Sequence, residues 1–265
     1  MNSAELARVC HGSSFPWRHV LIFLGATLVH SLWLISAQIW WDVSLGYIAF
    51  PQLGPALGLL TLWVIYREEL RCFLPIKSSR MMAFRYRGRL VVLICVIYVG
   101  STWLLAEVLN VAHFYPIFQD WHLIGFLTVQ YFGAFFEEIG WRGFLQPIFV
   151  ERFGPLAGTL IVGTLWAAWH GDQLLDLSDF LVFASTCIAI SYGIEMLMGG
   201  SWWQRALLAA AIHWTVNITP VVVINFDSDL PSNVPLMTAI LAPQYIVGCI
   251  GALILWKRRL PQLDR

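Results

Sequence analysis

The sequence predicts an all-α membrane protein, a bundle of eight transmembrane helices. Hydrophobic residues make up 58% of the 265 residues and charged residues only 12%, whereas a soluble domain usually carries about 25% charged residues. The mean hydropathy is +0.69, so a single water-facing core cannot hide this much apolar surface. The 14 tryptophans agree, because tryptophan favours the bilayer interface. We expect residues 1–265 to form one polytopic membrane domain.

Eight apolar segments supply the expected helices, and most have the roughly 20 residues that a spanning helix needs. The segments are residues 19–41, 43–66, 90–113, 122–146, 154–171, 180–198, 205–226 and 236–256. Segment 154–171 is short, so we expect it to tilt little or to lie inside the bundle. Segment 43–66 contains Pro51 and Pro55, which predict a kink.

The charges predict the orientation of the chain. Basic residues crowd one loop, residues 67–89: Arg67, Arg71, Lys77, Arg80, Arg85, Arg87 and Arg89. Such loops stay in the cytoplasm. With that loop inside, the other basic residues outside the spans also lie inside: Arg8, Arg18, Arg152, Arg205, Lys257, Arg258, Arg259 and Arg265. The outer loops then contain no lysine or arginine, and their charged residues are all aspartates: Asp42, Asp120, Asp172, Asp176, Asp179, Asp227 and Asp229. We expect both termini in the cytoplasm and no nucleic-acid partner, because topology explains the basic loop.

The cysteines predict neither disulfides nor metal binding. All five lie in cytoplasmic segments or within spans: Cys10, Cys72, Cys95, Cys187 and Cys249. None lies in an outer loop, so we expect no structural disulfide. There is no CxxC motif and no CaaX box at the end of the sequence, so we do not expect the chain itself to be prenylated there.

The stretch FFEEIGWRGFLQ, residues 135–146, places two glutamates and an arginine in an apolar helix. A charge at the bilayer centre costs about 2.5–3.5 kcal/mol on insertion scales, so we expect these residues to have a structural or functional role. Glu138 and Arg142 are i and i+4, share a helix face and can pair. Glu137 lies about 100° round the helix and can point elsewhere into the bundle. Alone, the triplet fits a packing ion pair or one supported and one reactive carboxylate.

Two further helices carry polar residues at the same spacing. Trp166 and His170 are i and i+4, as are His213 and Asn217. Alone, each pair also fits a structural role, as an interfacial histidine or as a polar contact between helices. Together with the glutamates they suit water-dependent acyl chemistry. A carboxylate takes a proton from water, a histidine passes it on, and polar donors hold the developing oxyanion.

Three motifs carry a resemblance to a known family. EEIGWR matches EExxxR, HWTVN matches HxxxN, and WAAWH is similar to FxxxH with Trp166 in place of phenylalanine. Their order resembles the CPBP family of intramembrane glutamic proteases, which includes the type II CAAX prenyl endopeptidases and bacteriocin-processing or Abi-type proteins. The motif-bearing core covers residues 120–220, somewhat under half the chain. The resemblance implies an eight-helix bundle around a polar, water-filled intramembrane cavity.

The resemblance also implies roles for the motif residues. Glu137 would activate water with help from His170, and His213 and Asn217 would form an oxyanion hole. The supporting residues would be Glu138, Arg142 and Trp166. The substitution at Trp166 keeps an aromatic wall, so it affects the shape of the pocket more than its chemistry.

Two questions stay open at this point. The first is depth: His170 lies near the outer end of its segment, whereas His213 lies about 12 Å in from Arg205 at the cytoplasmic end. His170 and His213 can lie at the same depth in the membrane only if a predicted helix end is wrong, or if helix 5 starts later and part of 147–160 lies along the interface. The second is zinc, because one glutamate and two histidines can bind Zn²⁺. We expect no cofactor, since HExxH is absent and asparagine is a poor zinc ligand.

Four other ionisable residues within the apolar segments receive structural interpretations. We expect Glu195 to reach the cytoplasmic interface beside two glycines, and His113 to lie at the outer interface. His30 and Glu107 are expected to pair between helices, with Glu107 the strongest candidate of the four for a residue behind the cavity wall.

The sequence therefore predicts an intramembrane endopeptidase in the lipid bilayer that cuts a membrane-associated protein or peptide. Its substrate would be a lipidated C-terminus, a leader peptide or a C-terminal sorting signal. The alternatives are a transporter and a non-catalytic scaffold that binds peptides. A compact chain without an added domain favours a bacterial or archaeal plasma membrane, where prenylated CaaX proteins are not the expected substrates. The oligomeric state stays open.

Overall fold

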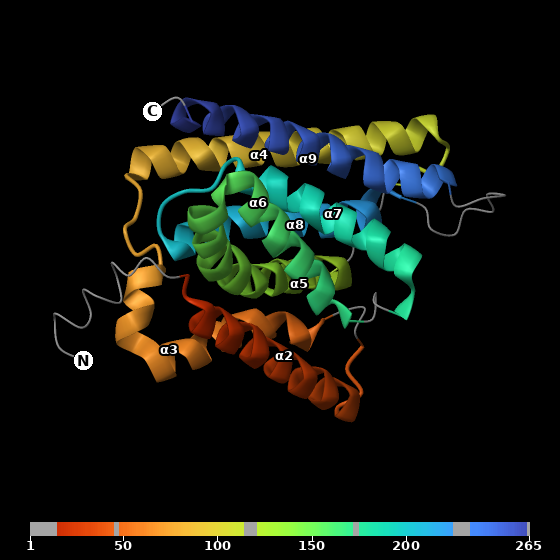
Figure 1. The fold of residues 1–265 in the computed structure, drawn as a ribbon. Coiled ribbons are helices and arrows are strands. Elements are labelled where there is room, and N and C mark those ends of the chain that lie inside the picture. The colour runs from red at the N-terminus through yellow and green to blue at the C-terminus, as the bar shows by residue number, and fades with distance from the viewer. Residues whose placement is uncertain (1–14, 45–47, 114–120, 172–174, 225–233, 264–265) are drawn as a thin grey trace.

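A computed structural model describes residues 15–44, 48–113, 121–171, 175–224 and 234–263, and this part of the chain is helical (Figure 1). The α-helices are α2 (Trp17–Trp40), α3 (Gly54–Phe73), α4 (Met81–Val108), α5 (Trp121–Gly140), α6 (Gln146–Trp169), α7 (Leu177–Glu195), α8 (Trp202–Val223) and α9 (Val234–Leu263). A 3₁₀-helix, η1 (Phe50–Leu53), precedes α3, and a π-helix, η3 (Trp141–Leu145), joins α5 to α6. The described residues form no β-strand, only an isolated bridge between Ala112 and Ile224.

Six helical stretches of the described residues are long and apolar enough to cross a membrane, as expected of an integral multi-pass membrane protein. They are Trp17–Trp40, Met81–Val108, Trp121–Trp169, Leu177–Glu195, Trp202–Val223 and Val234–Lys257. Helix α3 is not among them, and the 49-residue stretch Trp121–Trp169 counts as one. The count of eight transmembrane helices therefore stays a prediction.

The predicted helix 43–66 has different bounds, and the kink expected at its prolines is wrong. Its α-helix begins at Gly54 and continues to Phe73, so part of the expected cytoplasmic loop is helical. Pro51 and Pro55 lie at the first positions of η1 and α3, where a missing backbone N–H costs nothing. The non-helical residue is Tyr66, with φ −129° and ψ 37°.

A sharp reversal within α6 separates the predicted helices 122–146 and 154–171. Gly154 has φ 80° and ψ 166°, and Pro155 follows it. A Cβ added at Gly158 would lie 2.6 Å from the Phe149 carbonyl group, although nine residues of straight helix would separate the two by about 13 Å. The chain therefore folds back on itself at Gly154. The fifth predicted segment, 154–171, begins at this turn.

The helices form layers around a buried centre. Helices α4 and α9 lie side by side at the top of Figure 1, α2 and α3 lie together at the bottom, and the others lie between them. Helix α8 packs against both α4 and α5. It is also the most enclosed of the six candidate spans, with 61% of its span residues buried against 22–44% for the others. The helix that carries His213 and Asn217 is thus central.

The expectation of no structural disulfide is wrong. Cys72 is disulfide-bonded, whereas the other described cysteines, Cys95, Cys187 and Cys249, are free. The prediction rested on the reducing conditions of the cytoplasm, and these conditions do not determine which cysteines the fold brings close together. Cys10 lies outside the described residues, as do Arg8, Asp120, Asp172, Asp227, Asp229 and Arg265 from the topology prediction.

Candidate active site

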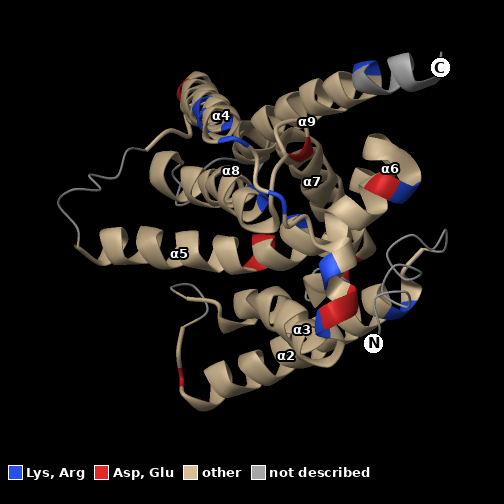
Figure 2. Cartoon of the chain, turned by 90° about the vertical axis from the view of Figure 1, so that its left-hand side faces the viewer, with Lys and Arg blue, Asp and Glu red and all other residues tan. Residues whose placement is uncertain are grey.

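The EEIGWR segment lies where α5 gives way to the π-helix. Figure 2 shows α5 without charge along its length until the acidic segment near its end, in the middle of the bundle. A π-helix is rare and often marks a functional site. The carbonyl oxygen of Arg142 accepts a hydrogen bond from Arg205 Nε at 2.9 Å. Arg205, on α8, therefore holds this turn of the π-helix from outside the motif.

Glu138 and Arg142 form the ion pair that their spacing predicts. Arg142 Nη1 lies 2.9 Å from Glu138 Oε1, and both side chains are fully buried. Arg142 Nη2 donates to Ser191 Oγ at 2.8 Å, and the guanidinium carbon lies 4.2 Å from the centre of the Trp166 ring. Three helices thus surround the buried cation.

His213 contacts the same carboxylate, a contact that the sequence did not predict. Its Nδ1 lies 2.8 Å from Glu138 Oε1, and its side chain is 3% exposed. Its ring packs edge-on against Trp166, with ring centres 4.9 Å apart. An ionised Glu138 only accepts, so Nδ1 carries the proton of this hydrogen bond. Glu138 therefore orients the ring of His213.

Glu137 points away from Arg142, as its angular position predicts. Its Oε1 accepts a hydrogen bond from Gln52 Nε2 at 3.0 Å, and its Oε2 accepts one from Trp166 Nε1 at 3.0 Å. The residue is 1% exposed. Both oxygens accept, which suits an ionised carboxylate. Among the described residues, no lysine or arginine forms an ion pair with Glu137.

His170 lies at the end of α6 with one nitrogen engaged. Its Nδ1 is 2.9 Å from the carbonyl oxygen of Trp166, so Nδ1–H donates and Nε2 keeps its lone pair when the ring is neutral. The ring also packs edge-on against Phe183 of α7, with ring centres 4.9 Å apart. The side chain is half-buried.

All four predicted catalytic side chains line one cavity of about 750 Å³. Glu137, His170, His213 and Asn217 share it with Gln52 and Trp166. Side chains from α7, α8 and α9 complete the wall: Asp179, Val182, Phe183, Thr186, Cys187, Ile190, Val216, Pro220, Met237, Ile240, Leu241 and Gln244. The residues of the three motifs therefore meet, despite their apparent difference in depth.

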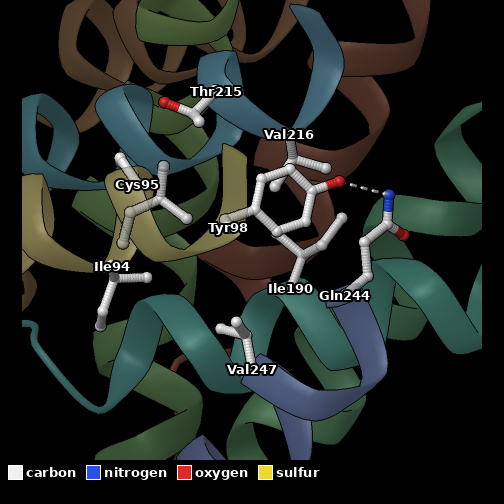
Figure 3. A pocket seen from close by; sticks show the side chains of 9 residues that line it. Ile94, Cys95, Tyr98, Ile190, Thr215, Val216, Gln244 and Val247 are labelled. Atoms are coloured by element: carbon white, nitrogen blue, oxygen red, sulfur yellow. Dashed lines mark hydrogen bonds between the residues drawn. The ribbon is translucent and has the colours of Figure 1, made fainter. Parts of the chain in front are cut away.

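A small apolar space adjoins this cavity between α4, α7, α8 and α9 (Figure 3). Gln244, Ile190 and Val216 line both spaces. Gln244 Nε2 donates to the Tyr98 hydroxyl at 3.3 Å. Its Oε1 is buried and has no hydrogen-bond partner within the described part of the chain. Gln244 is thus a polar group on the α9 wall that the motifs did not indicate.

Gln52 is a second residue that the motifs missed. It lies on η1, 85 positions before the glutamate that it contacts, so no local spacing connects the two. A Cβ at Gly133 would lie 2.1 Å from Gln52 Oε1, so the missing side chain of Gly133 admits Gln52 beside α5. A polar residue within a predicted apolar span was the available signal.

We expect Gln52→Ala to lower kcat of the activity proposed below about tenfold with KM unchanged, because a hydrogen bond to a charged group is lost. Gly133→Ala should act in the same direction, since its methyl group displaces the Gln52 side chain. Gly100→Ala on α4 is the matched control, because nothing lies within 4 Å of a Cβ there. Kinetics of the purified variants check this, and unchanged kcat in Gln52→Ala would contradict it.

Glu195 and Glu107 differ from their expected places. Glu195 is 8% exposed and does not reach out to the interface. Its Oε2 accepts from Arg205 Nη2 at 2.9 Å and from Gln146 Nε2 at 2.7 Å. Glu107 is exposed and does not line the cavity. His30 does pair between helices, with Nε2 2.8 Å from Thr61 Oγ1.

No three His, Cys, Asp or Glu side chains of the described residues come close enough together to hold a metal ion. In particular, the cavity wall offers His170 and His213 together with Glu137, but each of the three is hydrogen-bonded to a different protein group. The role of zinc stays a question for experiment.

The comparison with protein families agrees with the resemblance drawn from the motifs. The model of the type II CAAX prenyl endopeptidase Rce1-like family matches residues 119–219, which confirms the family expected from EExxxR and HxxxN. The matched region runs from the start of α5 into α8. It includes the four predicted catalytic residues and excludes Gln52 and Gln244. No curated protein matches the sequence.

Proposed function

Residues 119–219 match the model of the type II CAAX prenyl endopeptidase Rce1-like family, and from this similarity we propose that the protein is an intramembrane endopeptidase of the glutamic type. The observation that carries the proposal is the shared cavity: side chains of three separate motifs line it. The peptide bond of a membrane-associated protein or peptide would enter this cavity, which holds the water that attacks it.

Glu137 is the general base. Its two hydrogen bonds, from Gln52 and Trp166, hold the carboxylate in one orientation inside the cavity. No arginine or lysine of the described residues neutralises it, unlike Glu138, which Arg142 engages. A general base contributes about 10²- to 10⁴-fold to the rate. The water that Glu137 deprotonates becomes the nucleophile for the carbonyl carbon.

His170 passes a proton to the leaving amine. The Trp166 carbonyl oxygen binds Nδ1 and so leaves Nε2 to face the reaction. Nε2 receives the proton that Glu137 took from water and delivers it to the leaving nitrogen as the C–N bond breaks.

His213 and Asn217 hold the developing oxyanion. The Asn217 amide donates directly. His213 already donates from Nδ1 to Glu138, so Nε2 donates only when the imidazole is protonated. Glu138 holds the ring of His213 in position through that hydrogen bond. The two glutamates therefore have different roles: Glu137 deprotonates water, and Glu138 orients His213, a donor to the oxyanion. A donor of this kind is worth about 2.7–4 kcal/mol in known cases.

A cleavage assay tests the proposal with purified protein in detergent and a library of quenched peptides that each contain an apolar segment. His170→Ala and His213→Ala should each lower kcat/KM by about 10²-fold or more. His30→Ala is the matched control, because His30 binds Thr61 away from the cavity. Activity that survives both cavity substitutions would overturn the proposal and favour the transporter or the peptide-binding scaffold.

Metal dependence gives a separate prediction. We expect cleavage to be unchanged after incubation with a chelator and dialysis, since the reaction needs a carboxylate base and no bound ion. Activity that is abolished by the chelator and restored by added Zn²⁺ would contradict this and assign Glu137 and the histidines to a metal.

In this proposal the chain forms eight membrane-embedded helices with both termini in the cytoplasm. The apolar wall of the cavity suits the hydrocarbon portion of a substrate anchored in the bilayer. A lipidated C-terminus, a leader peptide and a C-terminal sorting signal all meet that description.

A further inference from the structure

Apart from its two histidines, the ionisable groups that carry charge on the described part of the cavity wall are acidic. Among the described residues, Glu137 and Asp179 line the cavity and no lysine or arginine does. Arg142 is fully buried against Glu138 and Ser191. The segments 172–174 and 225–233, next to these helices in sequence, contain three aspartates and no lysine or arginine.

One face of α7 forms a long wall of the cavity. Its lining residues follow helical spacing: Asp179, Val182, Phe183, Thr186, Cys187 and Ile190. From Asp179 to Ile190 the wall measures about 16 Å, at 1.5 Å per residue. Helix α9 adds a parallel series at the same spacing: Met237, Ile240, Leu241 and Gln244. The length of this wall matches about five residues of extended peptide, at 3.3 Å each.

Contacts along α7 place Asp179 relative to the candidate catalytic groups. The Phe183 ring packs against the His170 ring, with ring centres 4.9 Å apart. Asp179 lies four residues before Phe183, which is about 6 Å along the helix. An extended peptide covers that distance in about two residues. Asp179 therefore faces a substrate residue two or three positions from the bond that is cut.

The Asp179 carboxylate is not needed to cap α7. Asp176 is the N-cap, and its Oδ1 accepts from the backbone N–H groups of Ser178 at 2.8 Å and Asp179 at 3.1 Å. The hydrogen bond from the Ser178 hydroxyl, with those from the backbone, holds the pKa of the Asp176 carboxyl below its ordinary value. Asp179 is exposed, and no described side chain pairs with its carboxylate. An acidic residue in the first turn also interacts favourably with the helix dipole, but this interaction does not require the Asp179 side chain to line the cavity.

We infer that the substrate carries a lysine or arginine two or three residues from the scissile bond, and that Asp179 binds this side chain at the mouth of the cavity. The inference rests on the proposed endopeptidase function. Apolar residues of the substrate then run along the wall that α7 and α9 form.

The test measures the charge preference of the cleavage sites in a peptide library. Each peptide carries an apolar segment followed by six varied positions, and mass spectrometry identifies the bonds cut by the wild-type protein. We expect lysine or arginine to be up to about fivefold enriched two or three residues from the cut, the upper end of the range for an exposed ion pair. Asp179→Asn should abolish the enrichment, and Asp179→Lys should convert it to a preference for aspartate and glutamate. Asp42→Asn is the control, because Asp42 is exposed and does not line the cavity.

A binding measurement separates failure of this inference from failure of the proposed function. Glu137→Gln captures one fluorescent library peptide in versions with lysine or glutamate at the selected position, and fluorescence anisotropy gives both affinities. We expect tighter binding of the lysine peptide, a loss of the difference in Glu137→Gln with Asp179→Asn, and a weaker difference at high salt. Equal affinities overturn the inference even if no peptide is cut. If the affinities differ but the wild-type protein cuts no peptide of the library, the inference holds as a binding preference and the proposed endopeptidase function is overturned.

The inference also predicts that a free C-terminal carboxylate near the cut disfavours cleavage, whereas a basic side chain favours it. Peptides that end two or three residues beyond the cut should be poorer substrates with a carboxylate than with a C-terminal amide, because Asp179 repels the carboxylate. Asp179→Lys should reverse that order. Better cleavage of the carboxylate peptides by the wild-type protein would contradict the inference and point to a substrate cut near its own C-terminus.

Discussion

Replacing Glu137 with glutamine should lower kcat of peptide cleavage by about 10²- to 10⁴-fold, the usual share of a general base. Glutamine keeps the size of the side chain but cannot accept a proton at neutral pH. Peptide binding should change little, because the apolar walls and Asp179 are untouched. Single-turnover kinetics in detergent measure the loss.

The fold should tolerate this substitution. The amide nitrogen of glutamine would face one of the two donors, Gln52 or Trp166, so about 1 kcal/mol of stability is at risk. A thermal melt checks that the variant is folded. Glu151→Gln is the matched control, because Glu151 is exposed on α6 and does not line the cavity. Cleavage by Glu137→Gln at the wild-type rate would remove the glutamic mechanism.

Replacing Arg142 with leucine should destabilise the protein by about 3–5 kcal/mol, because Glu138 keeps a charge in the core without its partner. Arg142→Lys should be intermediate, since an ammonium cannot reproduce the forked contacts with Glu138 and Ser191. Chemical or thermal unfolding in detergent measures both effects. Arg71→Leu, which breaks the exposed pair with Glu68, should cost less than about 1 kcal/mol.

The double variant Glu138→Leu with Arg142→Leu separates charge from packing. Removing both charges should restore much of the stability lost in Arg142→Leu, because no unpaired ion is left. Its catalytic activity should stay low, since His213 loses the carboxylate that orients it. A double variant as unstable as the single one would show that packing around the guanidinium and Trp166, and not charge, holds this region.

Relations within one helix were predictable from spacing. Glu138 and Arg142 pair because four residues of helix bring side chains to the same face, and Glu137 points away for the same reason. The order of the three motifs also sufficed to identify the family, which the match over residues 119–219 confirms.

Relations between helices were not predictable in this way. Gln52 reaches Glu137 across 85 positions, and Glu195 pairs with Arg205 and Gln146 instead of lying at the interface. The bounds of α3 were missed because apolar residues at its start form a 3₁₀-helix and charged residues continue its end.

By itself, the sequence determined that the chain is helical and suited to a membrane, which family it resembles and which side chains are candidates for the proposed chemistry, because hydropathy and helical period are local properties. The tertiary structure alone decided that the motif residues share a cavity. The reversal at Gly154 and the central place of α8 bring His170 and His213 to one wall. It also decided which group each carboxylate meets: Glu138 faces a cation and His213, whereas Glu137 faces neutral donors. A charge buried in a bundle takes its role from neighbours on other helices, and only packing determines those neighbours.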